Sequence, residues 1–268
     1  MKHWRHSSQG IHTISINLLS ELIHEFTCRC PKLRSLNISR CKNLNSTKIA
    51  MLVATFCKDI EFLSMAGISL FSADIRYILS HCKKIQMLNL AWVAGDQEVI
   101  IQSAELRTLK VFGSCFGELY VDCPKLVRLD CSACMDLIKL RLSTSTAASL
   151  SAIDCYGCAM LLEEEWEEFL KGDWLPVQGT IGGTQPIEIE AREGSSPCFA
   201  KLKLFHVGCT QLSHQVIEKI IAACPLLVSL SLARCTSISD LPDLSPLGDL
   251  AYLDLSETRK KKTLHPLT

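Results

Sequence analysis

Two pairs of cysteines have the spacing that comes nearest to a metal-binding site. Cys131 and Cys134 form one C-x-x-C pair, Cys155 and Cys158 form a second, and twenty residues separate them. Four thiolates at such a spacing are typical of structural zinc. Both pairs, however, fall on the same two positions of a repeated pattern, an inward strand position and the turn position after it. We therefore interpret the thiols as buried packing groups, predict no metal and no cofactor, and keep a zinc protein as a remote alternative.

Other residue types that do chemistry are not arranged for it. Segment 179–184 is rich in glycine but lacks the Gly-Lys-Ser/Thr ending of a phosphate-binding loop. The eight histidines do not cluster at ligand spacing, and no Ser, Cys or His stands in a recognisable triad context. We predict that the chain is not an enzyme.

Charge and composition exclude two classes of partner. Lys plus Arg equals Asp plus Glu, at 28 each, and only 6% of the residues are aromatic. A balanced charge gives no general attraction to nucleic acid or to an anionic membrane, and sparse aromatics argue against a base-stacking surface. An apolar content of 48% is enough for a packed core. These features predict neither a nucleic-acid partner nor a membrane partner.

The elements that position the cysteines are copies of one unit, L-x-x-L-x-L-x-x-C. Alternation of apolar and polar residues over a short run predicts a strand with one buried face, and one such strand cannot bury that face alone. From the second copy onward the starts are 20 to 27 residues apart, with one step of 52, which matches the period of leucine-rich repeats. The copies start at Ile11, Leu33, Ile60, Ile85, Leu106, Leu126, Leu150, Leu202, Leu227 and Leu250.

The predicted fold class is therefore α/β, a single leucine-rich-repeat solenoid over 1–268 with about nine to ten repeats within 11–258. Parallel strands are expected on its concave face, with helices behind them at both ends. Short rungs backed by a second strand are expected in the middle, where the strand pattern returns at 116–121 and 137–142. Glycine and proline mark 171–197 as a loop insertion, and 259–268 is predicted to be a basic tail.

Apolar residues at helical spacing predict the helices at both ends. Ser46, Ser72 and Ser213 precede such segments and are predicted as their N-caps. A similar segment occupies 19–26, and 161–170 has the pattern of an acidic amphipathic helix.

Three units begin and end in cysteine, and these carry a family resemblance. The segments 30–41, 123–134 and 224–235 share the pattern C-P-x-L-x-x-L-x-x-x-x-C. They resemble the cysteine-containing leucine-rich repeats of F-box/LRR proteins, although no F-box is visible in this chain. The resemblance implies substrate recognition for an SCF-type ubiquitin ligase, with the adaptor bound through a module missing from this chain. A scaffold or immune-receptor-type domain without a ubiquitin link is the alternative, because 241–247 resembles plant immune-receptor repeats.

Cysteine usage and the first residues indicate a compartment. There are 15 cysteines, an odd number, and the first ten residues lack the apolar stretch of a signal peptide. Reduced thiols are typical of the cytosol and the nucleus, so we expect a cytoplasmic or nuclear protein.

The candidate binding site lies on the concave face, where outward residues of stacked strands line up in columns. Aromatic residues in or beside these columns favour a protein-binding site around Trp92, Phe112 and Tyr156. The predicted site comprises Asn37, Phe62, Ser64, Met87, Asn89, Trp92, Lys110, Phe112, Arg128, Asp130, Asp154, Tyr156, His206, Ser231, Tyr252 and Asp254.

Overall fold

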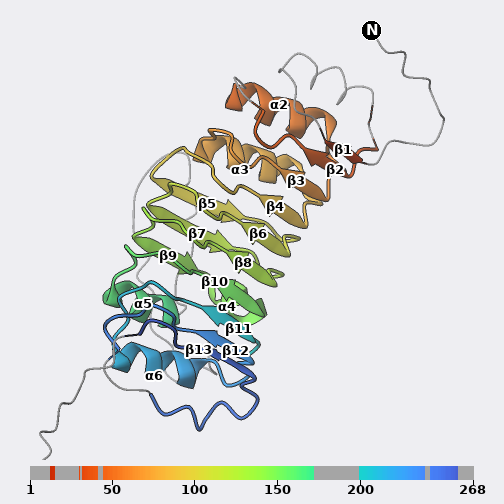
Figure 1. The fold of residues 1–268 in the computed structure, drawn as a ribbon. Coiled ribbons are helices and arrows are strands. Elements are labelled where there is room, and N and C mark those ends of the chain that lie inside the picture. Colours follow the sequence, from red (N-terminus) through yellow and green to blue (C-terminus); the bar gives the residue numbers. More distant parts are fainter. Residues whose placement is uncertain are drawn as a thin grey trace, which may run out of the picture.

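Ten short parallel strands form one continuous sheet along an elongated solenoid (Figure 1). The computed structural model describes residues 13–15, 30, 32–41, 45–171, 199–238 and 242–258. The sheet contains β1 (Thr13–Ser15), β2 (Ser35–Asn37), β3 (Phe62–Ser64), β4 (Met87–Asn89), β6 (Thr108–Lys110), β8 (Arg128–Asp130), β10 (Ala152–Asp154), β11 (Leu204–His206), β12 (Ser229–Ser231) and β13 (Tyr252–Asp254). Each strand coincides with one predicted copy of the unit, so the α/β leucine-rich-repeat solenoid is confirmed.

In the ten-stranded sheet, the middle residue of each strand from β2 to β12 belongs to the core. The strands pair in register, so these residues form one column through the solenoid. Each member of the column is at most 1% exposed: Leu36, Leu63, Leu88, Leu109, Leu129, Ile153, Phe205 and Leu230. Burying one such side chain stabilises the fold by about 1.5–3 kcal/mol, and this requires stacked neighbours.

Helices and a second sheet cover the other side of the ten strands (Figure 1). The helices are α2 (Ser46–Phe56), α3 (Ser72–His81), α4 (Thr144–Ser149), α5 (Glu163–Lys171) and α6 (His214–Ala223). The second sheet contains β5 (Glu98–Gln102), β7 (Glu118–Asp122) and β9 (Lys139–Leu142), all parallel. The strand-backed middle is thus confirmed. The structure adds β5, with Val99 and Ile101 fully buried, and the short helix α4, neither of which was predicted.

The helix caps agree with the prediction in one case out of three. Ser213 caps α6 and accepts a hydrogen bond from the Val216 amide, as predicted. For α2 the prediction was wrong by one residue, because the longer Asn45 side chain reaches the Lys48 amide at 2.8 Å. For α3 the N-cap is Phe71, and the Ser72 amide donates instead to the Asp96 carboxylate at 2.6 Å.

A turn of constant geometry follows each strand of the ten-stranded sheet from β2 to β13. Its third residue has a positive φ, near 60° in most repeats, in the left-handed region that glycine adopts most easily. The amide of this residue donates to the next repeat, as from Trp92 to the Phe112 carbonyl at 2.8 Å. The residues in this position are Arg40, Gly67, Trp92, Gly113, Ala133, Gly157, Cys209, Arg234 and Glu257. The strand ladder therefore continues one step into the turns.

Three predicted segments lie wholly or mostly outside the described residues. They are the helical segment at 19–26, the loop insertion and the basic tail at 259–268. Helix α5 includes Lys171, the first residue of the predicted insertion, and 172–197 lies outside.

Candidate protein-interaction surface

The cysteine pairs lie in the core and use backbone carbonyls as their partners. The Cys131 and Cys155 sulfurs are 3.2 Å apart on neighbouring repeats. Cys134 Sγ donates to the Val111 carbonyl at 3.1 Å, and Cys158 Sγ donates to the Cys131 carbonyl at 3.0 Å. Burial raises the pKa of Cys134 to about 12, which disfavours the thiolate that a metal needs. Within the described residues, no group of three or more His, Cys, Asp or Glu side chains is placed to hold a metal ion, so the geometry gives no support to the zinc alternative.

The outward polar residues line up in a column, as predicted, and five of them accept a hydrogen bond from the backbone of the turn that follows. The Asp130 Oδ1 atom accepts a hydrogen bond from the Ser132 amide at 3.2 Å, and Asp154 Oδ1 accepts one from the Tyr156 amide at 3.0 Å. Asn89 bonds the Ala91 amide in the same way. The same bond recurs at Asn37 and Asp254. In each case one side-chain oxygen accepts the hydrogen bond, which makes an Asx turn and holds the chain in place after the strand.

Two members of the predicted site are not accessible, so their inclusion was wrong. Ser64 is 2% exposed and its hydroxyl is 2.7 Å from the Ser39 hydroxyl. Ser231 is 5% exposed and donates to the Asp254 carboxylate at 3.3 Å. A serine is short, so neighbouring rungs cover it even on an outward position.

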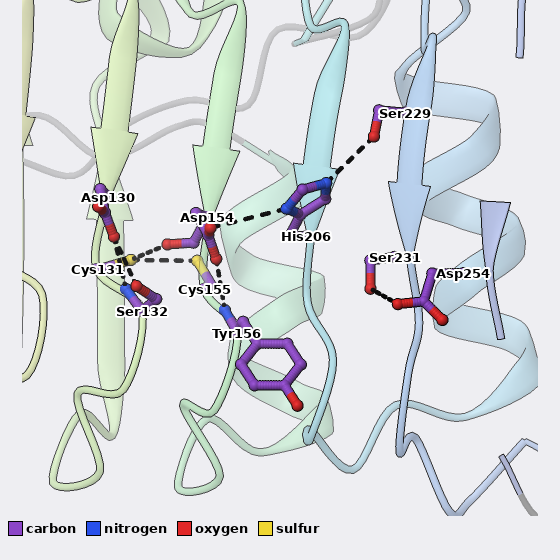
Figure 2. Close-up of polar contacts among 10 residues, drawn as sticks. All are labelled: Asp130, Cys131, Ser132, Asp154, Cys155, Tyr156, His206, Ser229, Ser231 and Asp254. Atoms are coloured by element: carbon purple, nitrogen blue, oxygen red, sulfur yellow. Dashed lines mark hydrogen bonds and ion pairs between the residues drawn. The ribbon is translucent and has the colours of Figure 1, made fainter. Parts of the chain in front are cut away.

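Asp154, His206 and Ser229 lie side by side on β10, β11 and β12 (Figure 2). The His206 Nε2 atom is 3.1 Å from Ser229 Oγ, and His206 Nδ1 is 3.7 Å from Asp154 Oδ2. Burial alone would raise the pKa of Asp154, but contacts with His206 and the Tyr156 amide outweigh burial and lower it. The carboxylate is therefore charged at neutral pH.

The order acid, imidazole, hydroxyl is that of a nucleophilic triad, but two features argue against catalysis. The distance of 3.7 Å between His206 and Asp154 exceeds hydrogen-bond reach. The Ser229 amide donates to the Lys203 carbonyl, so it does not serve as an oxyanion donor. The arrangement orients an imidazole on the sheet face. Sequence reasoning did not include Ser229, because Ser229 and His206 occupy different columns and meet only diagonally.

The aromatic residues form the apolar part of the surface. Trp92 is 54% exposed and contacts Phe112 edge to face, with ring centroids 4.7 Å apart. Tyr156, 37% exposed, stands in the same position of its turn as Phe112, two repeats further on. We call Trp92, Phe112 and Tyr156 the aromatic strip. It lies at the carboxyl ends of β4, β6 and β10, which is where the sequence placed the centre of the site.

The remaining predicted residues are spread over the same face of the sheet. Phe62 and Met87 are half-buried at the first positions of β3 and β4, and Lys110 is half-buried at the end of β6. Arg128 is exposed at the start of β8. Tyr252 is 53% exposed because it lies on β13, at the end of the sheet.

Comparisons with known proteins bear on the repeats. Residues 13–161 match the family described as FBD-associated F-box protein At5g56370, LRR repeats. No curated protein matches the chain. Among solved structures, the internalin InlF of Listeria monocytogenes is similar, with 14% identity over 85% of this chain and 76% of that chain and a TM-score of 0.28. Among the helices of the described residues, none is long and apolar enough to cross a membrane.

Proposed function

The chain belongs to the family of leucine-rich repeats of FBD-associated F-box proteins, and from this premise we propose that it recognises the target protein of an SCF-type ubiquitin ligase. Leucine-rich-repeat families are generally non-enzymatic modules that bind proteins, and the chain is such a protein-interaction domain. In this proposal the target protein binds the open face of the ten-stranded sheet.

The observation that carries the proposal is the exposed aromatic strip on a sheet face without covering helices. Within the described residues, all five helices and the second sheet lie on the opposite side (Figure 1). Exposed Trp and Tyr residues are enriched among the residues that dominate binding energy at protein interfaces. A partner on this face would bury Trp92 and Tyr156 without rearranging the core.

The ligase role needs an adaptor-binding module. The part of the chain that the structure describes contains no three-helix F-box, so the adaptor would contact another segment or another chain. As part of the same proposal we place the protein in the cytosol or nucleus. The described cysteines all have free thiols, which suits a reducing compartment.

A pull-down with the purified adaptor and cullin subunits tests the ligase role. Residues 1–268 are compared with a longer chain that includes any upstream sequence encoded by the gene. Retention of the adaptor by the longer chain supports the proposal. If neither chain retains the adaptor, the ligase role is rejected, and a scaffold that binds protein on its sheet face takes its place.

A further inference from the structure

We propose that the aromatic strip anchors an extended segment of the target protein in which an apolar or aromatic side chain is flanked by Lys or Arg. This inference rests on the proposed function and names the chemistry of the partner.

The rings of the strip are held in place before any partner binds. Trp92 lies against Gly113, where an added Cβ would be 2.6 Å from the Trp92 Cε3 atom. Tyr156 lies against Gly208 in the same way, with a Cβ there 2.7 Å from the ring. Each ring therefore rests on a backbone that has no side chain, and keeps the rest of its surface for contact. An anchor that is already ordered loses little conformational entropy on binding.

The spacing of the anchors suits an extended chain that crosses the strands. Phe112 and Tyr156 are two rungs apart, which is about 9.6 Å at the usual strand spacing of about 4.8 Å. A polyproline II segment repeats its face every third residue, about 9.3 Å apart. Two side chains three residues apart can therefore contact both rings.

The charges on the sheet face indicate that the partner segment is basic. At the carboxyl ends of the strands, the outward column contains Asp130 and Asp154 beside the strip and Asp254 three rungs beyond Asp154, against one cation, Lys110 (Figure 2 shows the carboxylates). Two arginines stand in the turns at this end: Arg234 is paired with Glu257 at 2.9 Å, and Arg40 lies two rungs before β4. Other cations lie at or just before the amino ends, where Arg107, Arg128 and Lys203 are exposed. A basic side chain next to an apolar anchor thus meets carboxylates, and an acidic one does not.

The repeats themselves indicate which substitutions the fold tolerates. Glycine occupies the Trp92 position in three other repeats, and Ser132 occupies the Tyr156 position on the rung before it. Asn89 makes the same turn bond as Asp130 and Asp154 without a charge. Trp92→Gly, Tyr156→Ser and the double variant Asp130→Asn with Asp154→Asn therefore remove an anchor or a charge while keeping the local backbone.

The test uses a phage-displayed library of random peptides of about twelve residues, selected on the purified chain. The selected sequences are synthesised with a fluorescent label and their affinities measured by anisotropy. We expect selected peptides to carry Lys or Arg within three residues of an aromatic or aliphatic residue. Trp92→Gly and Tyr156→Ser should each weaken binding about tenfold or more. The double Asn variant should weaken it several-fold and flatten its salt dependence. Tyr77→Ser, on the helical side, should change nothing.

Three results overturn the inference. One is selection of acidic or uncharged peptides, the second is failure to select any peptide, and the third is unchanged affinity in Trp92→Gly and Tyr156→Ser. Phe62→Ser separates this failure from failure of the proposed function. If Phe62→Ser weakens binding and the strip variants do not, the sheet face remains the receptor surface with a different anchor. If only Tyr77→Ser weakens binding, the proposed function fails as well.

Discussion

Replacing Gly113 with Ala should destabilise the protein more than the same change at Gly157. Both glycines occupy the left-handed turn position, with φ values of 66° and 80°, so each substitution adds a backbone cost of about 1 kcal/mol. At Gly157 the nearest atom to the new Cβ is Ala133 Cα, at 3.5 Å, which is ordinary contact. At Gly113 the new Cβ lies 2.6 Å from the Trp92 ring, and displacing a packed ring adds about 1–3 kcal/mol.

Urea denaturation followed by far-ultraviolet circular dichroism measures this difference. We expect losses of about 2–4 kcal/mol for Gly113→Ala and about 1 kcal/mol for Gly157→Ala. A Trp92→Gly background removes the ring, so in that background Gly113→Ala should cost only about 1 kcal/mol. Equal losses at the two glycines, or no rescue by Trp92→Gly, would refute the packing of Trp92 against Gly113.

Three further predictions concern a hydroxyl, a carboxylate and two thiols. Thr146→Val should lower the free energy of unfolding by about 1–3 kcal/mol in the same assay, because the Thr146 hydroxyl accepts a hydrogen bond from the buried Cys123 amide at 2.7 Å. A loss below about 0.5 kcal/mol would contradict this. The pKa of Asp154 in the folded protein lies below its usual 3.8. The stability that the charged carboxylate contributes is therefore fully present above pH 3.8 and is lost as the pH falls through the folded pKa. The wild type should thus lose stability on acidification more steeply than Asp154→Asn. Native alkylation read by mass spectrometry should modify exposed Cys115 first and Cys134 only after unfolding, and early labelling of Cys134 would count against its burial.

The sequence predicted the register of the sheet because the side-chain period of a strand is two. Once Leu36 and its equivalents are aligned at steps of one repeat, the inward and outward columns follow, and all ten strands lie where the pattern placed them. The backing strands β7 and β9 were predicted by the same alternation. Strand β5 was not predicted, although its buried Val99 and Ile101 alternate with polar or less buried residues in the same way.

The hydrogen bonds from the outward side chains to the turn backbone were not predicted from the sequence. The pattern shows that Asn89 and Asp130 point outward, but it does not show that each bonds the amide two residues on. The turn did carry one signal in the sequence. Glycine stands at the Trp92 position in other repeats, which indicates a positive φ there, and this backbone directs the Trp92 ring toward Gly113 on the next rung. The meeting of His206 with Ser229 needed the diagonal geometry of neighbouring strands.

Site-specific photo-crosslinking to a purified target tests the central claim most directly. Benzoylphenylalanine is introduced at Phe112 on the sheet face, or at Tyr77 on α3, which is 41% exposed on the helical side. We predict that the target crosslinks from position 112 and not from position 77. Crosslinking from position 77 alone would contradict it, because the target would then bind the helical side of the solenoid.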